Sequence, residues 1–118
     1  MENKWKSEFR KWVERAGGIC YLIHGHAMQA PGIPDVWVAT RWWCGWIEFK
    51  QGLNHLSTAQ RVKGRALERF GAFVVVRFSP KTMQLENVNE EPIELFERSE
   101  SCLSQLFSRL SELRSQGL

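Results

Sequence analysis

Residues 32–50 read GIPDVWVATRWWCGWIEFK, a pattern typical of two β-strands joined by a tight turn. Branched and aromatic side chains are frequent in strands, so residues 35–40 and 44–50 are predicted to form a hairpin. Pro34 restricts the backbone before the first of these strands and cannot donate to a sheet. Asp35 is therefore expected at the beginning of a strand, near the rim of a sheet.

Glu48 and Lys50 are expected on one face of the second strand, because side chains alternate between faces along a strand. Ile47 and Phe49 then occupy the other face and enter the core. The hairpin brings Asp35 beside Glu48, and two close carboxylates raise each other's pKa. A divalent cation such as Mg²⁺ relieves this repulsion, with the Phe49 carbonyl as a further candidate ligand.

The chain that follows the hairpin predicts a strand–helix–strand unit. Ser57 is a suitable N-cap for a helix over 58–70, and Gly71 is suited to end it. Residues 72–78 (AFVVVRF) are rich in β-branched and aromatic side chains and are predicted as a strand. Strands joined through a helix lie parallel, so 44–50 and 72–78 are expected to be parallel neighbours.

The periodicity of apolar residues and the positions of Gly and Pro predict the rest of the chain. The remaining expected elements are a helix at 3–16, a strand at 19–23, a loop at 24–34, a short strand at 83–88 and a final helix at about 92–116. The final helix is predicted because its apolar residues form one stripe, namely Phe96, Leu103, Leu106, Leu110 and Leu113. The expectation is a single α/β domain over residues 1–118, with a central mixed sheet flanked by helices.

Charge is distributed unevenly along the 118 residues, whose formal net charge is +3. Residues 1–81 contain 13 Lys or Arg and 6 Asp or Glu, whereas residues 82–118 contain 3 and 7. The first part is therefore the part suited to face a polyanion. No apolar run is long enough to span a bilayer, and the charged N-terminus lacks the features of a signal peptide. We expect a cytoplasmic protein with no membrane contact.

Three cysteines, Cys20, Cys44 and Cys102, are widely spaced and lack a CxxC motif, so they are expected to be reduced thiols. A zinc site that combines Cys20 or Cys44 with His24 and His26 is the less favoured interpretation.

The spacing of the acidic and basic residues matches a known family. GIPD, then 12 residues, then EFK resembles the PD-(D/E)xK nuclease superfamily, and Leu56-Ser57-x-x-Gln60 strengthens the match. The pattern looks like the VRR-NUC branch, small nucleases of phages and bacteria that are similar to Holliday-junction resolvases. The Val-Arg-Arg element that names this branch is met only by Val76-Arg77.

This resemblance covers about residues 5–78 and implies a restriction-endonuclease-like αβββαβ core. It also implies hydrolysis of DNA phosphodiesters with Mg²⁺ or Mn²⁺, in a bacterial or phage-infected cell. Asp35 and Glu48 would bind the metal, and Lys50 would assist the attacking water. Gln60 matches a family glutamine that can hydrogen-bond a water or the scissile phosphate. A glutamate of the first helix is expected to join the site, with Glu8 preferred over Glu2 and Glu14.

Several basic and imidazole side chains are expected to contact DNA, because phosphate neutralisation drives non-specific binding. The candidates are His24, His26, Arg61, Lys63, Arg65 and Lys11. Trp42, Trp43 and Trp46 cluster near the hairpin turn, where packing in the core or a dimer is favoured over stacking on bases.

The favoured function is a structure-selective endonuclease that cuts branched or four-way junction DNA as a homodimer. Two alternatives stay open: a generic or nicking nuclease, and a non-catalytic DNA-binding module of the same fold. The residues also leave open whether one or two metals are used, and whether RNA is a substrate.

Overall fold

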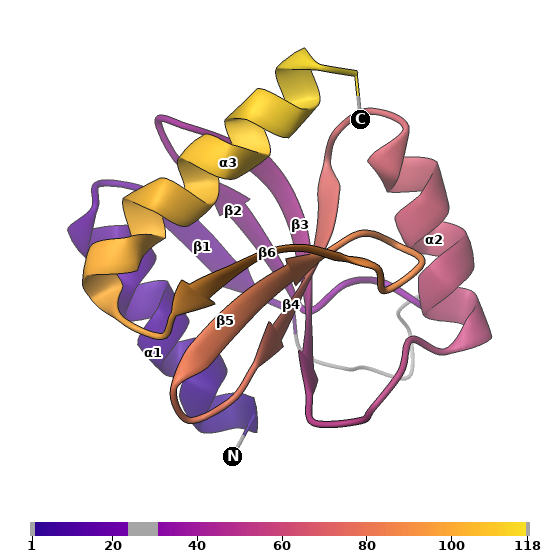
Figure 1. The fold of residues 1–118 in the computed structure, drawn as a ribbon, viewed down its shortest axis with the longest axis horizontal. Helices are drawn as coiled ribbons and strands as arrows, with labels where there is room; N and C mark the ends of the chain where they lie inside the picture. Colours follow the sequence, from indigo (N-terminus) through magenta and orange to yellow (C-terminus); the bar gives the residue numbers. More distant parts are fainter. Residues whose placement is uncertain (1, 24–30, 118) are drawn as a thin grey trace.

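The computed structural model describes residues 2–23 and 31–117, and Figure 1 shows their arrangement. The elements in chain order are α1 (Glu2–Arg15), β1 (Ile19–Leu22), β2 (Val36–Ala39), β3 (Cys44–Gln51), α2 (Thr58–Glu68), β4 (Phe73–Phe78), β5 (Thr82–Glu86), β6 (Pro92–Glu97), the 3₁₀ helix η1 (Glu100–Cys102) and α3 (Leu103–Ser115). The predicted Ser57 cap of the second helix is confirmed, since its side chain accepts from the Gln60 N–H.

The strands form one six-stranded sheet in the order β1-β2-β3-β4-β5-β6. The predicted antiparallel hairpin is confirmed, with Trp37 of β2 opposite Trp46 of β3. The predicted parallel pair is confirmed as well, because Glu48 of β3 is in register with Val75 of β4. The other neighbouring strands are antiparallel, so the sheet is mixed as expected.

Helices cover the two faces of the sheet unequally (Figure 1). α1 and α3 pack on one face, where the ring centroids of Phe9 (α1) and Phe107 (α3) lie 6.2 Å apart. Both rings belong to the core cluster that includes the buried Phe49 of β3. α2 packs on the opposite face through a smaller cluster that includes Leu56 and Phe73. We call this second face the α2 side of the sheet. Because side chains alternate along a strand, Glu48 and Lys50 of β3 project from the α2 side, as does Arg77 of β4, which pairs with Lys50. Trp37 of β2 and Trp46 of β3, which pair with each other, project from the same side.

The prediction of a helix from Pro92 is wrong for residues 92–97. These residues form the edge strand β6, which pairs with β5 so that the buried Phe96 lies opposite Met83. Proline is tolerated as the first residue of an edge strand, and pairing with the preceding strand β5 overrides the helical pattern of apolar residues. The predicted C-terminal helix is therefore present but shorter than expected, since α3 begins only at Leu103.

Tryptophans near the hairpin turn pack inside the domain, as expected. Trp43 is buried, and its ring lies 6.3 Å from Phe107. The ring of Trp42 stacks on the same phenylalanine with a centroid distance of 6.3 Å, and Trp46 packs against the cluster beneath α2. Among residues 2–23 and 31–117, no helix has the length and apolar character needed to cross a membrane.

Candidate active site

Asp35 and Glu48 lie opposite each other at the open end of the β2–β3 hairpin. Val36 pairs with Ile47, so Asp35, one residue before β2, is aligned with Glu48. The backbone N–H of Phe49 donates to Asp35 Oδ2 at 2.9 Å and fixes the orientation of this carboxyl group. The structure therefore brings together the two carboxyl groups that the sequence pattern singles out.

Glu48 is a buried acid with an incomplete set of hydrogen bonds, since only 3% of its surface is exposed. Burial raises the pKa of Glu48 to about 9, and the Asp35 carboxyl adds to the increase through its charge and a hydrogen bond. Lys50 and Lys6 act in the opposite direction. Among the described residues no donor reaches Glu48 Oε1. A proton shared with Asp35, or a cation, satisfies this oxygen.

Three polar side chains from three different elements hold the carboxyl pair. Lys50 Nζ of β3 lies 3.7 Å from Glu48 Oε2. Gln60 Nε2 of α2 donates to the same oxygen at 3.1 Å. Lys6 Nζ of α1 donates to Asp35 Oδ1 at 3.0 Å. Sequence reasoning missed Lys6, and the only signal for it is its position next to Trp5 at the border of the apolar stripe of α1.

Gln60 has a second role that explains why the motif joins it to Ser57. The side-chain Oε1 of Gln60 accepts from the backbone N–H of Ser57 at 2.9 Å, and the backbone N–H of Gln60 donates to Ser57 Oγ at 3.1 Å. These reciprocal bonds form a capping box at the beginning of α2. Because the amide oxygen is used in the cap, the amide nitrogen is turned toward Glu48.

Gly32 connects the GIPD segment to the same helix end. A Cβ at this position would lie 2.3 Å from the Ala59 carbonyl oxygen and 3.0 Å from the Gln60 nitrogen. Its φ of +86° also lies in the region that favours glycine. Glycine thus allows the chain leading into Asp35 to press against the first turn of α2.

Arg77 clamps the loop between Lys50 and the capping box. Its Nη1 donates to the carbonyls of Gly52 and Asn54 at 2.8 and 2.7 Å. Its Nε donates to Glu86 Oε2 at 2.9 Å, and its Nη2 donates to Glu90 Oε1 at 2.9 Å. The guanidinium therefore ties the loop to β4, β5 and the turn that follows β5.

Glu90 completes this clamp from the other side of the loop. Its Oε1 accepts from the Leu56 N–H at 3.3 Å and contacts His55 Nδ1 at 3.2 Å, while Arg61 Nη2 lies 3.3 Å from Oε2. Hydrogen bonds from His55 and Leu56 lower the pKa of Glu90, although burial acts in the opposite direction. The backbone of Glu90 has a φ of 62°, in the left-handed region that non-glycine residues rarely adopt. The sequence pattern gave no sign of this network beyond the match at Arg77.

Glu8 is not brought to the carboxyl pair. Its Oε1 lies 3.7 Å from Arg98 Nε, and 39% of its side chain is exposed. Lys6 faces Asp35, and Glu8 lies two residues further along α1, about 200° around the helix. Of the two alternatives, Glu2 begins α1, and Glu14 is exposed near its opposite end.

The residues expected to contact DNA lie in different settings. His24 and His26 fall outside the described residues. Arg61 is committed to its ion pair with Glu90. Arg65 donates to the Asn89 side chain at 3.2 Å, and Lys63 is exposed on the same helix. Lys11 is exposed on α1, about 140° around the helix from Lys6.

The donor set fits a hard divalent cation held by few protein ligands. The described residues contain no group of three or more His, Cys, Asp or Glu side chains that could hold a metal. Mg²⁺ commonly uses one or two carboxylates and completes its shell with water and substrate phosphate. Asp35 and Glu48 supply two carboxyl groups, and the free Glu48 Oε1 is an acceptor in need of a partner. The Phe49 carbonyl stays a predicted ligand.

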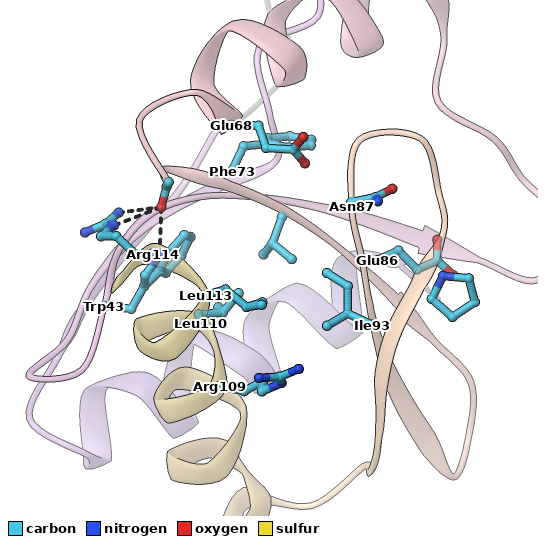
Figure 2. Close-up of a pocket in the computed structure, with 13 residues that line it drawn as sticks. Trp43, Glu68, Phe73, Glu86, Asn87, Ile93, Arg109, Leu110, Leu113 and Arg114 are labelled. Atoms are coloured by element: carbon cyan, nitrogen blue, oxygen red, sulfur yellow. Dashed lines mark hydrogen bonds between the residues drawn. The ribbon is translucent and has the colours of Figure 1, made fainter. Parts of the chain in front are cut away.

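A cavity of about 460 Å³ lies away from this site, between α3, the end of α2 and the turn after β5 (Figure 2). Trp43 Nε1 and Arg114 Nε both donate to the Gly71 carbonyl at its edge. Asp35 and Glu48 are not part of its lining. The carboxyl pair is thus presented on the sheet end rather than inside this cavity.

No protein-family model and no curated protein matches the sequence. Among solved structures, the chain is similar to Hjc of Archaeoglobus fulgidus, a Holliday junction resolvase from an archaeal hyperthermophile. The TM-score is 0.61 at 18% sequence identity, over 92% of this chain and 98% of that chain. The chain is less similar to DrdV, solved by cryo-EM in a complex with DNA, with a TM-score of 0.45 at 14% sequence identity. This match covers 92% of this chain and 11% of the DrdV chain.

The similarity to Hjc shows the fold of this chain. The mixed sheet, its flanking helices and the C-terminal helix confirm the expected restriction-endonuclease-like architecture.

Proposed function

We propose that this protein is a Mg²⁺- or Mn²⁺-dependent endonuclease that hydrolyses DNA phosphodiesters, with a preference for branched DNA. The observation that carries the proposal is the pairing of the partly exposed Asp35 with the buried Glu48, which has Lys50 beside it and an oxygen without a donor among the described residues. A binding module has no use for such a pair close to a phosphate, because the carboxyl groups repel the ligand.

Each side chain at the site has a role in this proposal. Asp35 and Glu48 would hold the cation with the Phe49 carbonyl, and a cation there supplies a Lewis acid for hydrolysis. Lys50 would stabilise the charge that develops on the phosphate. Gln60 orients Glu48 from the end of α2. Lys6 neutralises Asp35 in the metal-free protein.

The preference for branched DNA rests on two considerations. The fold is that of a protein described as a Holliday junction resolvase. In addition, the strands of residues 2–23 and 31–117 all belong to one sheet, and these residues include no separate module for reading base sequence. A four-way junction has two equivalent strands to cut, so we propose that the protein acts as a homodimer; the motif spacing favours the VRR-NUC branch for it. Sedimentation of the free and junction-bound protein tests this assembly.

Cleavage of a labelled panel in Mg²⁺ or Mn²⁺ tests the activity. The panel contains a linear duplex, a nicked duplex, a flap and a four-way junction of matched sequence. We expect the branched substrates to be cut faster, and Asp35→Asn to abolish cleavage without loss of DNA binding in EDTA. Glu97→Gln, an exposed position on β6, is the matched control.

Three results would change the proposal in different ways. Equal rates on all four substrates would remove the branch preference and leave a generic nuclease. Nicks in one strand only would indicate a nicking enzyme. Binding without metal-dependent cleavage, unchanged in Asp35→Asn, would leave the non-catalytic DNA-binding module.

A further inference from the structure

A row of aromatic side chains crosses the sheet directly beside the carboxyl pair. Tyr21 of β1 pairs with Trp37 of β2, which pairs in turn with Trp46 of β3. Side chains of directly paired residues project from the same face, so all three lie on the α2 side of the sheet. Trp37 follows Asp35 by two residues, which places the row about 7 Å along the strands from the carboxyl groups.

The two ends of this row differ in what covers them. Trp46 is partly buried and packs against the cluster beneath α2. Tyr21 is 60% exposed, although it is a large aromatic residue on the edge strand. Its ring stacks on Trp37 with a centroid distance of 5.9 Å and an interplanar angle of 23°. The Tyr21–Trp37 pair is thus a pre-ordered aromatic surface in which Tyr21 is open to solvent and Trp37 is half-buried.

We propose that the Tyr21–Trp37 pair stacks on an unpaired base next to the cleaved phosphate. This inference rests on the proposed nuclease function and names the feature of the substrate that the site selects. Stacking on aromatic side chains is open to every base but needs a base that is not already stacked in a duplex. A branch point or a single-stranded flank supplies such a base, whereas a continuous duplex does not.

A second copy of this chain is a poorer occupant of the same surface. A tyrosine or tryptophan buries at most about 250 Å², so the pair offers about 500 Å². A standard interface buries roughly 800 Å² on each partner. The position beside Asp35 and Glu48, on the same face and the same strands, favours the substrate of that site.

The test measures DNA binding in EDTA, which separates it from cleavage. Tyr21→Ala, Tyr21→Phe and the wild type are titrated with a fork that has unpaired nucleotides at the branch, and with a continuous duplex of the same sequence. Phe70→Ala is the matched control, because Phe70 is an aromatic residue 78% exposed on the chain just after α2. Thermal unfolding checks that each variant is folded.

One stacked base contributes about 5- to 150-fold in affinity, from a per-base value of roughly 1–3 kcal/mol. We expect Tyr21→Ala to weaken fork binding by a factor in this range and to leave duplex binding within about twofold. Tyr21→Phe should bind like the wild type because the ring is retained. 2-Aminopurine placed at the branch should lose fluorescence on binding the wild type but not Tyr21→Ala.

The outcomes distinguish this inference from the proposed function. Wild-type affinity of Tyr21→Ala for the fork, in a protein whose Asp35-dependent cleavage is intact, overturns the stacking site and leaves the nuclease standing. An equal loss on fork and duplex, or a change in oligomeric state caused by Tyr21→Ala, also overturns it. Failure of the wild type to bind or cleave any DNA overturns both.

Discussion

Replacement of Glu48 by glutamine should stabilise the metal-free protein at alkaline pH. Glutamine keeps the shape of the side chain but carries no charge at any pH. The wild-type carboxyl has a pKa of about 9 in the folded protein, against an ordinary value of 4.5. A carboxyl with a raised pKa contributes stability that is complete below the unfolded value, and that is lost as pH rises toward the folded value.

The size of the effect follows from the pKa difference. Between pH 4.5 and 9 the folded protein retains a proton on Glu48 that the unfolded chain has released. The free energy of unfolding then falls by about 1.4 kcal/mol per pH unit from this group alone. Between pH 5.5 and 8 the wild type should therefore lose roughly 3 kcal/mol more than Glu48→Gln.

Urea denaturation at pH 5.5, 6.5, 7.25 and 8, with EDTA present, measures this difference. Glu97→Gln serves as the control, because it removes an exposed carboxyl from β6 and should leave the pH profile unchanged. Parallel profiles for wild type and Glu48→Gln would refute the raised pKa. Mn²⁺ at pH 8 should raise the stability of the wild type more than that of Glu48→Gln, since a cation that binds only the folded protein stabilises it.

Three further predictions concern the supports of the site. Gln60→Ala should lower the free energy of unfolding, measured by urea denaturation, by about 1 kcal/mol because the capping box is lost. Gln60→Glu should keep the cap but lower the cleavage rate, because a second carboxylate would face Glu48. Arg77→Gln should lower the free energy of unfolding by about 3–5 kcal/mol, because it leaves the buried Glu86 without its cation. Adding Glu86→Gln to this variant should recover part of the loss, and a double-mutant cycle by urea denaturation measures the recovery. Gly32→Ala should lower the melting temperature because its Cβ would meet the Ala59 carbonyl, and circular dichroism measures this loss.

The hairpin and the parallel pair could be predicted because their signals are local. The alternation of residues 44–50 separates the core face from the face that carries Glu48. Ser57 and Gly71 mark the two ends of the connecting helix, and a helix between two strands makes them parallel. Asp35 could be placed at the strand beginning because Pro34 precedes it. Each of these inferences needs residues within one turn or one strand.

The missed features depend on strand pairing and side-chain contacts that no sequence motif specifies. Residues 92–97 are a strand because β5 is available to pair with them, which a helical pattern of apolar residues cannot reveal. Lys6 reaches Asp35 across 29 residues of sequence. Arg77 finds its carbonyl acceptors in a loop more than 20 residues earlier. The geometry of the sheet, rather than any motif, creates these contacts.

Two buried glutamates on the α2 side of the sheet, Glu86 and Glu48, differ in how well their charges are compensated. Glu86, 2% exposed, accepts from Arg77 Nε and Gln84 Nε2 through Oε2, so its charge faces a cation at 2.9 Å, although its Oε1, like that of Glu48, has no donor among the described residues. Glu48 is equally buried, yet its nearest cation, Lys50, stays at 3.7 Å and a second carboxyl lies beside it. A fold optimised for stability alone would place an apolar residue at position 48, because an uncompensated buried carboxyl is costly. The cost of a buried Glu48 carboxylate beside the Asp35 carboxyl group is relieved by a bound proton or a cation, which is why we place the chemistry at Glu48 and not at Glu86.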